Sequence, residues 1–110
     1  MATSVPTISS HVLDTSRGVP LAGLAIAVSR IDRDGVETAL GTVTTDHDGR
    51  AQDLLGRPLQ AGTYRLRFGL SGHSPFFRAM SVDIEVGDVS RSYHVPLLLT
   101  PFGLSTYLGS

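Results

Sequence analysis

Alternating apolar and polar positions run through much of the chain, and they predict strands. In residues 63–70 large apolar side chains alternate mainly with arginine, and in residues 81–86 valine and isoleucine alternate with acidic residues. A period of two gives each strand one apolar and one polar face. A third apolar row begins at Leu24 and breaks at Arg30 and Ile31, where we expect this strand to bend or end.

Turn-forming dipeptides separate these runs. Asp34-Gly35 predicts a hairpin between a strand ending near Ile31 and one starting near Glu37, and Asp48-Gly49 predicts a second turn. No segment of ten or more residues carries a helical stripe. The pattern therefore predicts seven or eight short strands, little or no helix, and an all-β sandwich in a single domain over residues 1–110.

Composition adds expectations about assembly and location. Hydrophobic residues make up 41% of the 110 positions and charged residues only 17%, which suggests that some surface is buried against other subunits of a small, oligomerising domain. The net charge of −1 indicates no basic face, so no nucleic acid partner is expected. The longest apolar run, residues 95–99, is too short for a membrane span, and residues 1–10 lack signal-peptide features, so we expect a cytoplasmic protein.

The residue types also limit the chemistry. The chain has no cysteine and no lysine, which excludes thiolate nucleophiles, cysteine metal sites and Schiff bases. Any catalysis must use histidine, arginine, carboxylates or hydroxyls. Such residues gather in four clusters, which are residues 10–15, 45–50, 92–101 and 105–110.

The third cluster contains a histidine with a defined orientation. Strand alternation places Tyr93, Val95, Leu97 and Leu99 on one apolar face, so His94 points away from that core, toward solvent or a subunit contact. An imidazole there could act as acid or base near neutral pH. On its own, however, a strand histidine is more often structural, and an arginine after a turn is usually a solvated charge.

Taken together, the four clusters resemble the motifs of the transthyretin-related 5-hydroxyisourate hydrolase family. The matching segments are His11-Val12-Leu13-Asp14, Asp48-Gly49-Arg50, Tyr93 to Pro101, and Ser105 to Ser110. The resemblance implies a sandwich of two four-stranded sheets and a homotetramer, a dimer of dimers with sites in the channel between dimers. It also implies metal-free hydrolysis of the small heterocycle 5-hydroxyisourate, in urate breakdown.

The resemblance assigns roles to particular positions. His11, Arg50, His94 and Ser110 would be catalytic, and Ser92, Tyr107, Leu108 and Gly109 would contact the substrate. Either histidine could deprotonate the attacking water, and Arg50 could bind the polar ring and offset negative charge. Ser110 could act through its hydroxyl or a terminal carboxylate. Two histidines with an arginine nearby make a poor divalent-cation site, so we expect no metal or cofactor.

The chain departs from the family pattern near the expected channel. Leu108 stands where the family has arginine, Ser92 where many members have a second histidine, and Leu104 where tyrosine is common. Residues 71–75 leave little room for the brief helix that many members carry there.

These departures leave three functions open. The first is the hydrolase itself, and the second is a related enzyme recruited to other ring-opening or cyclisation chemistry, for example in a biosynthetic pathway. The third is a non-catalytic binder of a small ligand, which the greasier Leu104 and Leu108 would favour.

Overall fold

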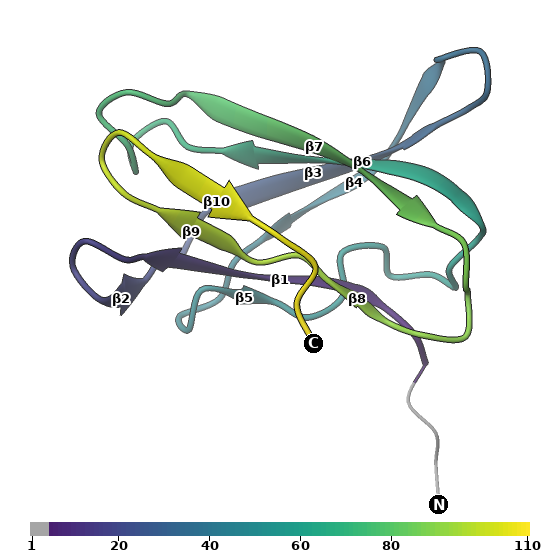
Figure 1. Ribbon diagram of the computed structural model, residues 1–110, viewed down its shortest axis with the longest axis horizontal. Coiled ribbons are helices and arrows are strands. Elements are labelled where there is room, and N and C mark those ends of the chain that lie inside the picture. The colour runs from purple at the N-terminus through teal and green to yellow at the C-terminus, as the bar shows by residue number, and fades with distance from the viewer. Residues whose placement is uncertain (1–4) are drawn as a thin grey trace, which may run out of the picture.

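Two β-sheets packed face to face form the body of the protein in the computed structural model, which describes residues 5–110 (Figure 1). Residues 1–4 lie outside the described residues. They belong to the predicted domain and to the segment 1–10 in which no signal peptide was expected. The predicted all-β sandwich is confirmed. Along residues 5–110 the chain forms no helix, including in the short 71–75 segment, and therefore no helix long enough to cross a membrane.

The first sheet has four antiparallel strands in the order β4-β3-β6-β7. Their bounds are β3, Ala25–Ile31; β4, Glu37–Thr44; β6, Gly62–Gly69; and β7, Ala79–Val86. The alternating runs at 63–70 and 81–86 thus correspond to paired strands, and a hairpin at residues 32–36 joins β3 to β4 as predicted. The end of the strand expected at Arg30 and Ile31 is confirmed, because β3 ends at Ile31, and the sequence pattern did not show the irregularity between Val28 and Ser29.

The second sheet is built around β1. It consists of six segments: β1, Ile8–Asp14; β2, Val19–Pro20; β5, Arg50–Ala51; β8, Tyr93–His94; β9, Leu97–Leu99; and β10, Leu104–Thr106. β8 and β9 run parallel to β1, whereas β2 and β5 pair with it antiparallel. Four of the segments form the continuous path β10-β9-β1-β2, and β5 and β8 pair with β1 beside that path.

A proline separates β8 from β9. Pro96 has no N–H to donate to the ladder, and the buried hydroxyl of Ser10 donates to the carbonyl of Val95 at 2.7 Å just before it. A side chain of β1 therefore holds the connection between β8 and β9 next to the residue that cannot donate to the backbone ladder.

The core lies between the sheets and contains the row predicted for residues 93–99. Tyr93, Val95, Leu97 and Leu99 are all buried, with at most 9% of their surface exposed. They pack in one cluster with Ile8 and Val12 of β1 and with side chains from β3, β6 and β7. Full burial of a single large apolar side chain stabilises a fold by about 2 kcal/mol, so this cluster fixes how the sheets face each other.

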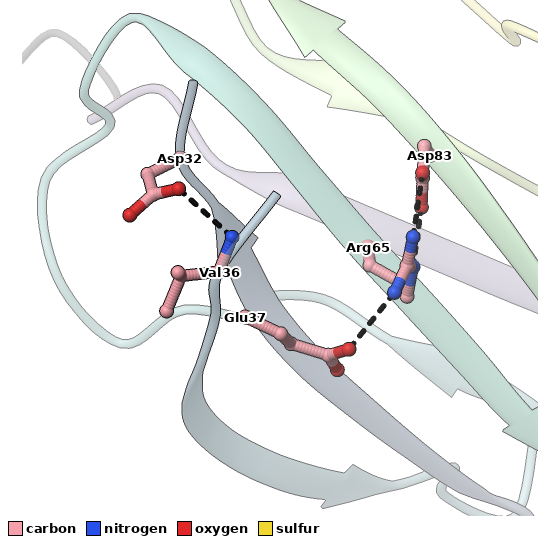
Figure 2. A network of polar contacts seen from close by, with 5 residues as sticks. All are labelled: Asp32, Val36, Glu37, Arg65 and Asp83. Atoms are coloured by element: carbon pink, nitrogen blue, oxygen red, sulfur yellow. Dashed lines mark hydrogen bonds and ion pairs between the residues drawn. The ribbon is translucent and has the colours of Figure 1, made fainter. Parts of the chain in front are cut away.

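A polar network holds the outer face of the four-stranded sheet (Figure 2). Arg65 donates to both carboxylate oxygens of Asp83 on β7, at 2.7 and 3.0 Å, and to Glu37 on β4 at 2.8 Å. The hydroxyl of Ser29 and the Arg65 guanidinium keep the pKa of Glu37 below its usual value, and Arg65 does the same for the pKa of Asp83. The network links strands across the sheet on the face away from the core.

The turn before β5 requires glycine at position 49. Gly49 has a φ of +74°, and a Cβ there would lie 2.5 Å from the carbonyl oxygen of Val12 on β1. Gly18 has a similar φ of +71°, but a Cβ there would meet nothing within 4 Å. A residue with a Cβ would therefore be strained at both positions, but it would clash with neighbouring atoms only at position 49.

We predict that Gly49→Ala destabilises the protein by about 3 kcal/mol, because strain and a clash with the backbone add. The matched change Gly18→Ala should cost only about 1 kcal/mol, from strain alone. Urea unfolding of both variants at one protein concentration measures the difference. Equal losses would mean that the close approach of Gly49 to β1 does not matter for stability.

Candidate active site

The parallel register between β1 and β8 places His94 beside Ser9. The two residues are Cα partners, and the Nδ1 of His94 lies 2.9 Å from the Oγ of Ser9. Tyr93 points into the core while His94 is half-buried on the opposite face, as the alternation predicts. Because a serine hydroxyl can donate or accept, this contact orients the ring while allowing either tautomer.

A tight turn presents Arg50 on the other side of β1. Asp46 accepts the backbone N–H groups of Asp48 at 2.9 Å and Arg50 at 3.0 Å, which hold the pKa of its carboxyl below the usual value. Arg50 then pairs with His11 on β1. Among the described residues, the Arg50 guanidinium has no hydrogen bond or ion pair, so its five N–H groups remain available to a ligand.

His11 is held by the same turn. Its Nε2 lies 2.9 Å from the carbonyl oxygen of Asp48. A carbonyl can only accept, so Nε2 carries the proton and donates, and Nδ1 is the free acceptor of the neutral ring. His11 is therefore fixed in one tautomer next to Arg50.

The C-terminal segment folds back against β8. The N–H of Gly109 donates to the carbonyl of His94 at 2.7 Å, and Thr106 Oγ1 donates to the carbonyl of Pro96 at 2.8 Å. A Cβ at position 109 would lie 2.8 Å from Cδ2 of the His94 ring. Glycine is thus needed here for close approach to the imidazole.

Two adjoining hollows meet at His94. The first has a volume of about 530 Å³ and is lined by Ser9, Ser10, Arg50, Gln52, Arg91, Ser92, His94, Gly109 and Ser110. The second, of about 510 Å³, is lined by Arg91, His94, Tyr107, Leu108, Gly109 and Ser110. These volumes are in the range of small-molecule sites.

Most of the residues singled out from the sequence line these hollows. Seven of the eight do so, and His11 is the exception, since it lies beside Arg50 without lining either hollow. Ser92 also has a structural role, because its Oγ accepts the N–H of Thr7 at 3.0 Å. Both Tyr107 and Leu108 are more than half exposed.

Sequence reasoning missed Ser9, Gln52 and Arg91. Ser9 precedes His11 by two positions and Gln52 follows Arg50 by two, so strand alternation could have placed both on the site face. Arg91 gives no such signal, because it lies in the loop before β8 and its position depends on the folded chain.

Burial and nearby positive charge lower the pKa of the His94 imidazole. Partial burial of His94 lowers its pKa below 6.5, and the positive charge of Arg50, together with that of His11 when its ring is protonated, lowers it further. The neutral ring is therefore favoured at neutral pH, where it can accept a proton. The folded state favours the neutral form of His94 more than the unfolded chain does. The resulting contribution of His94 to stability is present above about pH 6.5, the unfolded pKa, and is lost as the pH falls through the lower folded pKa.

Within residues 5–110, the ligand atoms of Asp46, His47 and Asp48 come close enough to hold a metal, within 4.8 Å of one another. All three are exposed. Asp46 already accepts two backbone N–H groups through Oδ1, so formation of the turn explains this group.

The fold and the site define a class of transthyretin-like sandwiches. In this class histidine and arginine lie beside β1, and the C-terminal segment folds back against β8. The model of the HIUase/Transthyretin family matches residues 8–109, and the chain belongs to this family.

Similar proteins agree with this membership. A Caulobacter vibrioides protein named 5-hydroxyisourate hydrolase is 40% identical, over 94% of this chain and 97% of its own. The structure of Klebsiella pneumoniae 5-hydroxyisourate hydrolase is 32% identical with a TM-score of 0.81, covering 96% of this chain and 99% of its own. Sea bream transthyretin, solved in complex with thyroxine, is 29% identical with a TM-score of 0.82 and 93% coverage of both chains.

We predict that Arg50→Gln raises the pKa of His94 toward its usual value, because the permanent positive charge that repels the protonated imidazole is removed. Burial remains in this variant, so the pKa should still lie below 6.5. NMR titration of the His94 ring measures the change. Arg33→Gln, at the tip of the β3–β4 hairpin, is the matched control and should leave the titration unchanged; no shift in Arg50→Gln would contradict the proximity of Arg50 to His94.

Proposed function

We propose that this protein hydrolyses 5-hydroxyisourate in urate breakdown. The observation that carries the proposal is the joint lining of one hollow by Arg50 and His94 beside the folded-back Gly109-Ser110 segment. Family members with matching full-length sequences bear the name 5-hydroxyisourate hydrolase. A small planar heterocycle suits the size of the hollow.

His94 acts as the general base in this proposal. Its lowered pKa keeps the imidazole neutral, so the ring can take a proton from water as the oxygen attacks a ring carbonyl. The tetrahedral oxyanion then collapses, the C–N bond of the ring breaks, and the leaving nitrogen takes the proton back from the imidazolium of His94. The products balance as substrate plus one water, without a cofactor.

The other site residues support this step. Arg50 holds the polar ring and stabilises the oxyanion, since its guanidinium has no competing partner among residues 5–110. His11 adds an acceptor at Nδ1 beside Arg50, and Ser110 offers a hydroxyl to the bound ring. Ser92, Tyr107, Leu108 and Gly109 form the walls around it.

A homotetramer completes the proposed site. The two hollows are open to solvent in the single chain, and Tyr107 and Leu108 are 54% and 58% exposed. A second pair of subunits facing this surface would shield the bound ring and its attacking water from bulk solvent and bury both side chains. The cytoplasmic location and the single domain over residues 1–110 stay predictions.

We predict that His94→Ala lowers kcat by at least about 100-fold, because the proton acceptor is lost. The assay follows the absorbance of freshly made urate oxidase product with and without the protein. Light scattering should report the same tetramer for the variant and the unaltered chain, which separates loss of the base from loss of assembly. Decay at the spontaneous rate with the unaltered chain would refute the hydrolase, and full activity of His94→Ala would remove His94 from the mechanism.

Leu108 favours the second candidate function, a family member recruited to other chemistry, because it puts an exposed apolar side chain beside the hollow. We predict that Leu108→Arg raises kcat/KM for 5-hydroxyisourate by about two- to threefold, by adding donors at the substrate. Leu108→Gln, which adds donors without charge, is the control. A loss of activity in Leu108→Arg would mean that the site is adapted to a different, more apolar substrate.

A further inference from the structure

Arg91 is a cation at the site to which no role has been given. It lines both hollows, and it shares this position only with His94, Gly109 and Ser110 among the described residues. Arg50, in contrast, lines only the first hollow. A ligand lying against the imidazole in either hollow would therefore meet the Arg91 side chain.

The Arg91 side chain rests on a fixed platform. Its guanidinium carbon lies 4.9 Å from the centre of the Tyr93 ring, a cation–π distance. Tyr93 itself is anchored, because its hydroxyl donates to the carbonyl of Asp88 at 2.8 Å and accepts the Asp88 N–H at 3.1 Å. Tyr93 is also buried and packed in the core, so its ring is a fixed surface for the guanidinium of a residue that lines both hollows.

The terminal nitrogens of Arg91 remain available. Its Nε donates to the carbonyl of Ser92 at 3.3 Å, and its two terminal nitrogens have no partner among residues 5–110. The hydroxyl and N–H of Ser90 donate to Asp88 and lower the pKa of its carboxyl, the charge of Arg91 adds to this lowering, and among residues 5–110 Arg91 forms no ion pair with Asp88. Arg65 shows the contrast, since all three of its nitrogens are engaged by Asp83 and Glu37.

We propose that Arg91 is a substrate-binding residue that presents a second guanidinium to the carbonyl oxygens of the planar heterocycle held at His94. This inference rests on the proposed function. Arg50 reaches the substrate from β5 and Arg91 from the loop before β8, so the two guanidinium groups hold it from different elements. Leu108 lines one of the hollows that Arg91 also lines, so Arg91 supplies the cationic contact that an apolar side chain at 108 cannot make.

The test is a kinetic comparison of Arg91→Gln, Leu108→Arg and the double variant Arg91→Gln/Leu108→Arg with the unaltered chain. We expect Arg91→Gln to raise KM by about tenfold with little change in kcat, since a charge-assisted contact is lost away from the bond that breaks. Arg91→Lys should be intermediate, because it keeps the charge but loses the planar fork. Arg67→Gln, on the outer face of the other sheet, is the matched control and should leave KM unchanged.

Leu108→Arg is the rescue. Because position 108 lines the same hollow, an arginine there should lower the raised KM of Arg91→Gln by about fivefold or more. The same substitution should lower the KM of the unaltered chain by a smaller factor. An unchanged KM in Arg91→Gln, or a fall in kcat that Leu108→Arg does not restore, would overturn the inference while the unaltered chain stays active. An unaltered chain without activity removes the proposed function instead, and this inference with it.

Discussion

The parallel pairing of β1 with β8 and β9 joins segments 85 residues apart in the chain, and both the sandwich and the site depend on it. The same register that aligns Ile8 with Tyr93 in the core aligns Ser9 with His94 at the site. Parallel strands cannot be joined by a tight turn. The chain between β1 and β8 is long, and it contains all four strands of the other sheet. The loop-closure cost is offset by burial of the apolar row on β8 and β9.

Charge at the site follows from this framework. His94 lies on one side of β1 and Arg50 on the other. Asp46 holds the backbone N–H of Arg50 in the turn and forms no ion pair with its guanidinium. A partly buried imidazole near the positive charge of Arg50 favours its neutral form, and an arginine without a carboxylate partner keeps its donors free. The site thus combines a proton acceptor with permanent positive charge, which suits an attack by water that generates an oxyanion.

The sequence predicted the parts of the fold that repeat with a period of two. β6, β7, the β3–β4 hairpin and the inward face of residues 93–99 follow directly from alternation and turn chemistry. β2 and β5 were beyond prediction because strands of two residues have no period, and they exist only through pairing with β1. Arg91 was missed for a similar reason, since a loop residue reaches the site only through its stack on Tyr93.

Tyr93 and His94 are consecutive residues with opposite destinations, one in the core and the other at the hollows. A slip of one residue in β8 would exchange them, placing an imidazole in the apolar cluster and a phenol ring at the site. A change in the length of the loop of residues 87–92 therefore bears on the site whenever it shifts the register of β8 by one residue. The loop of residues 70–78 leads into β7, which lines neither hollow, so relatives that share this reaction should differ in length there before they differ in the approach to β8.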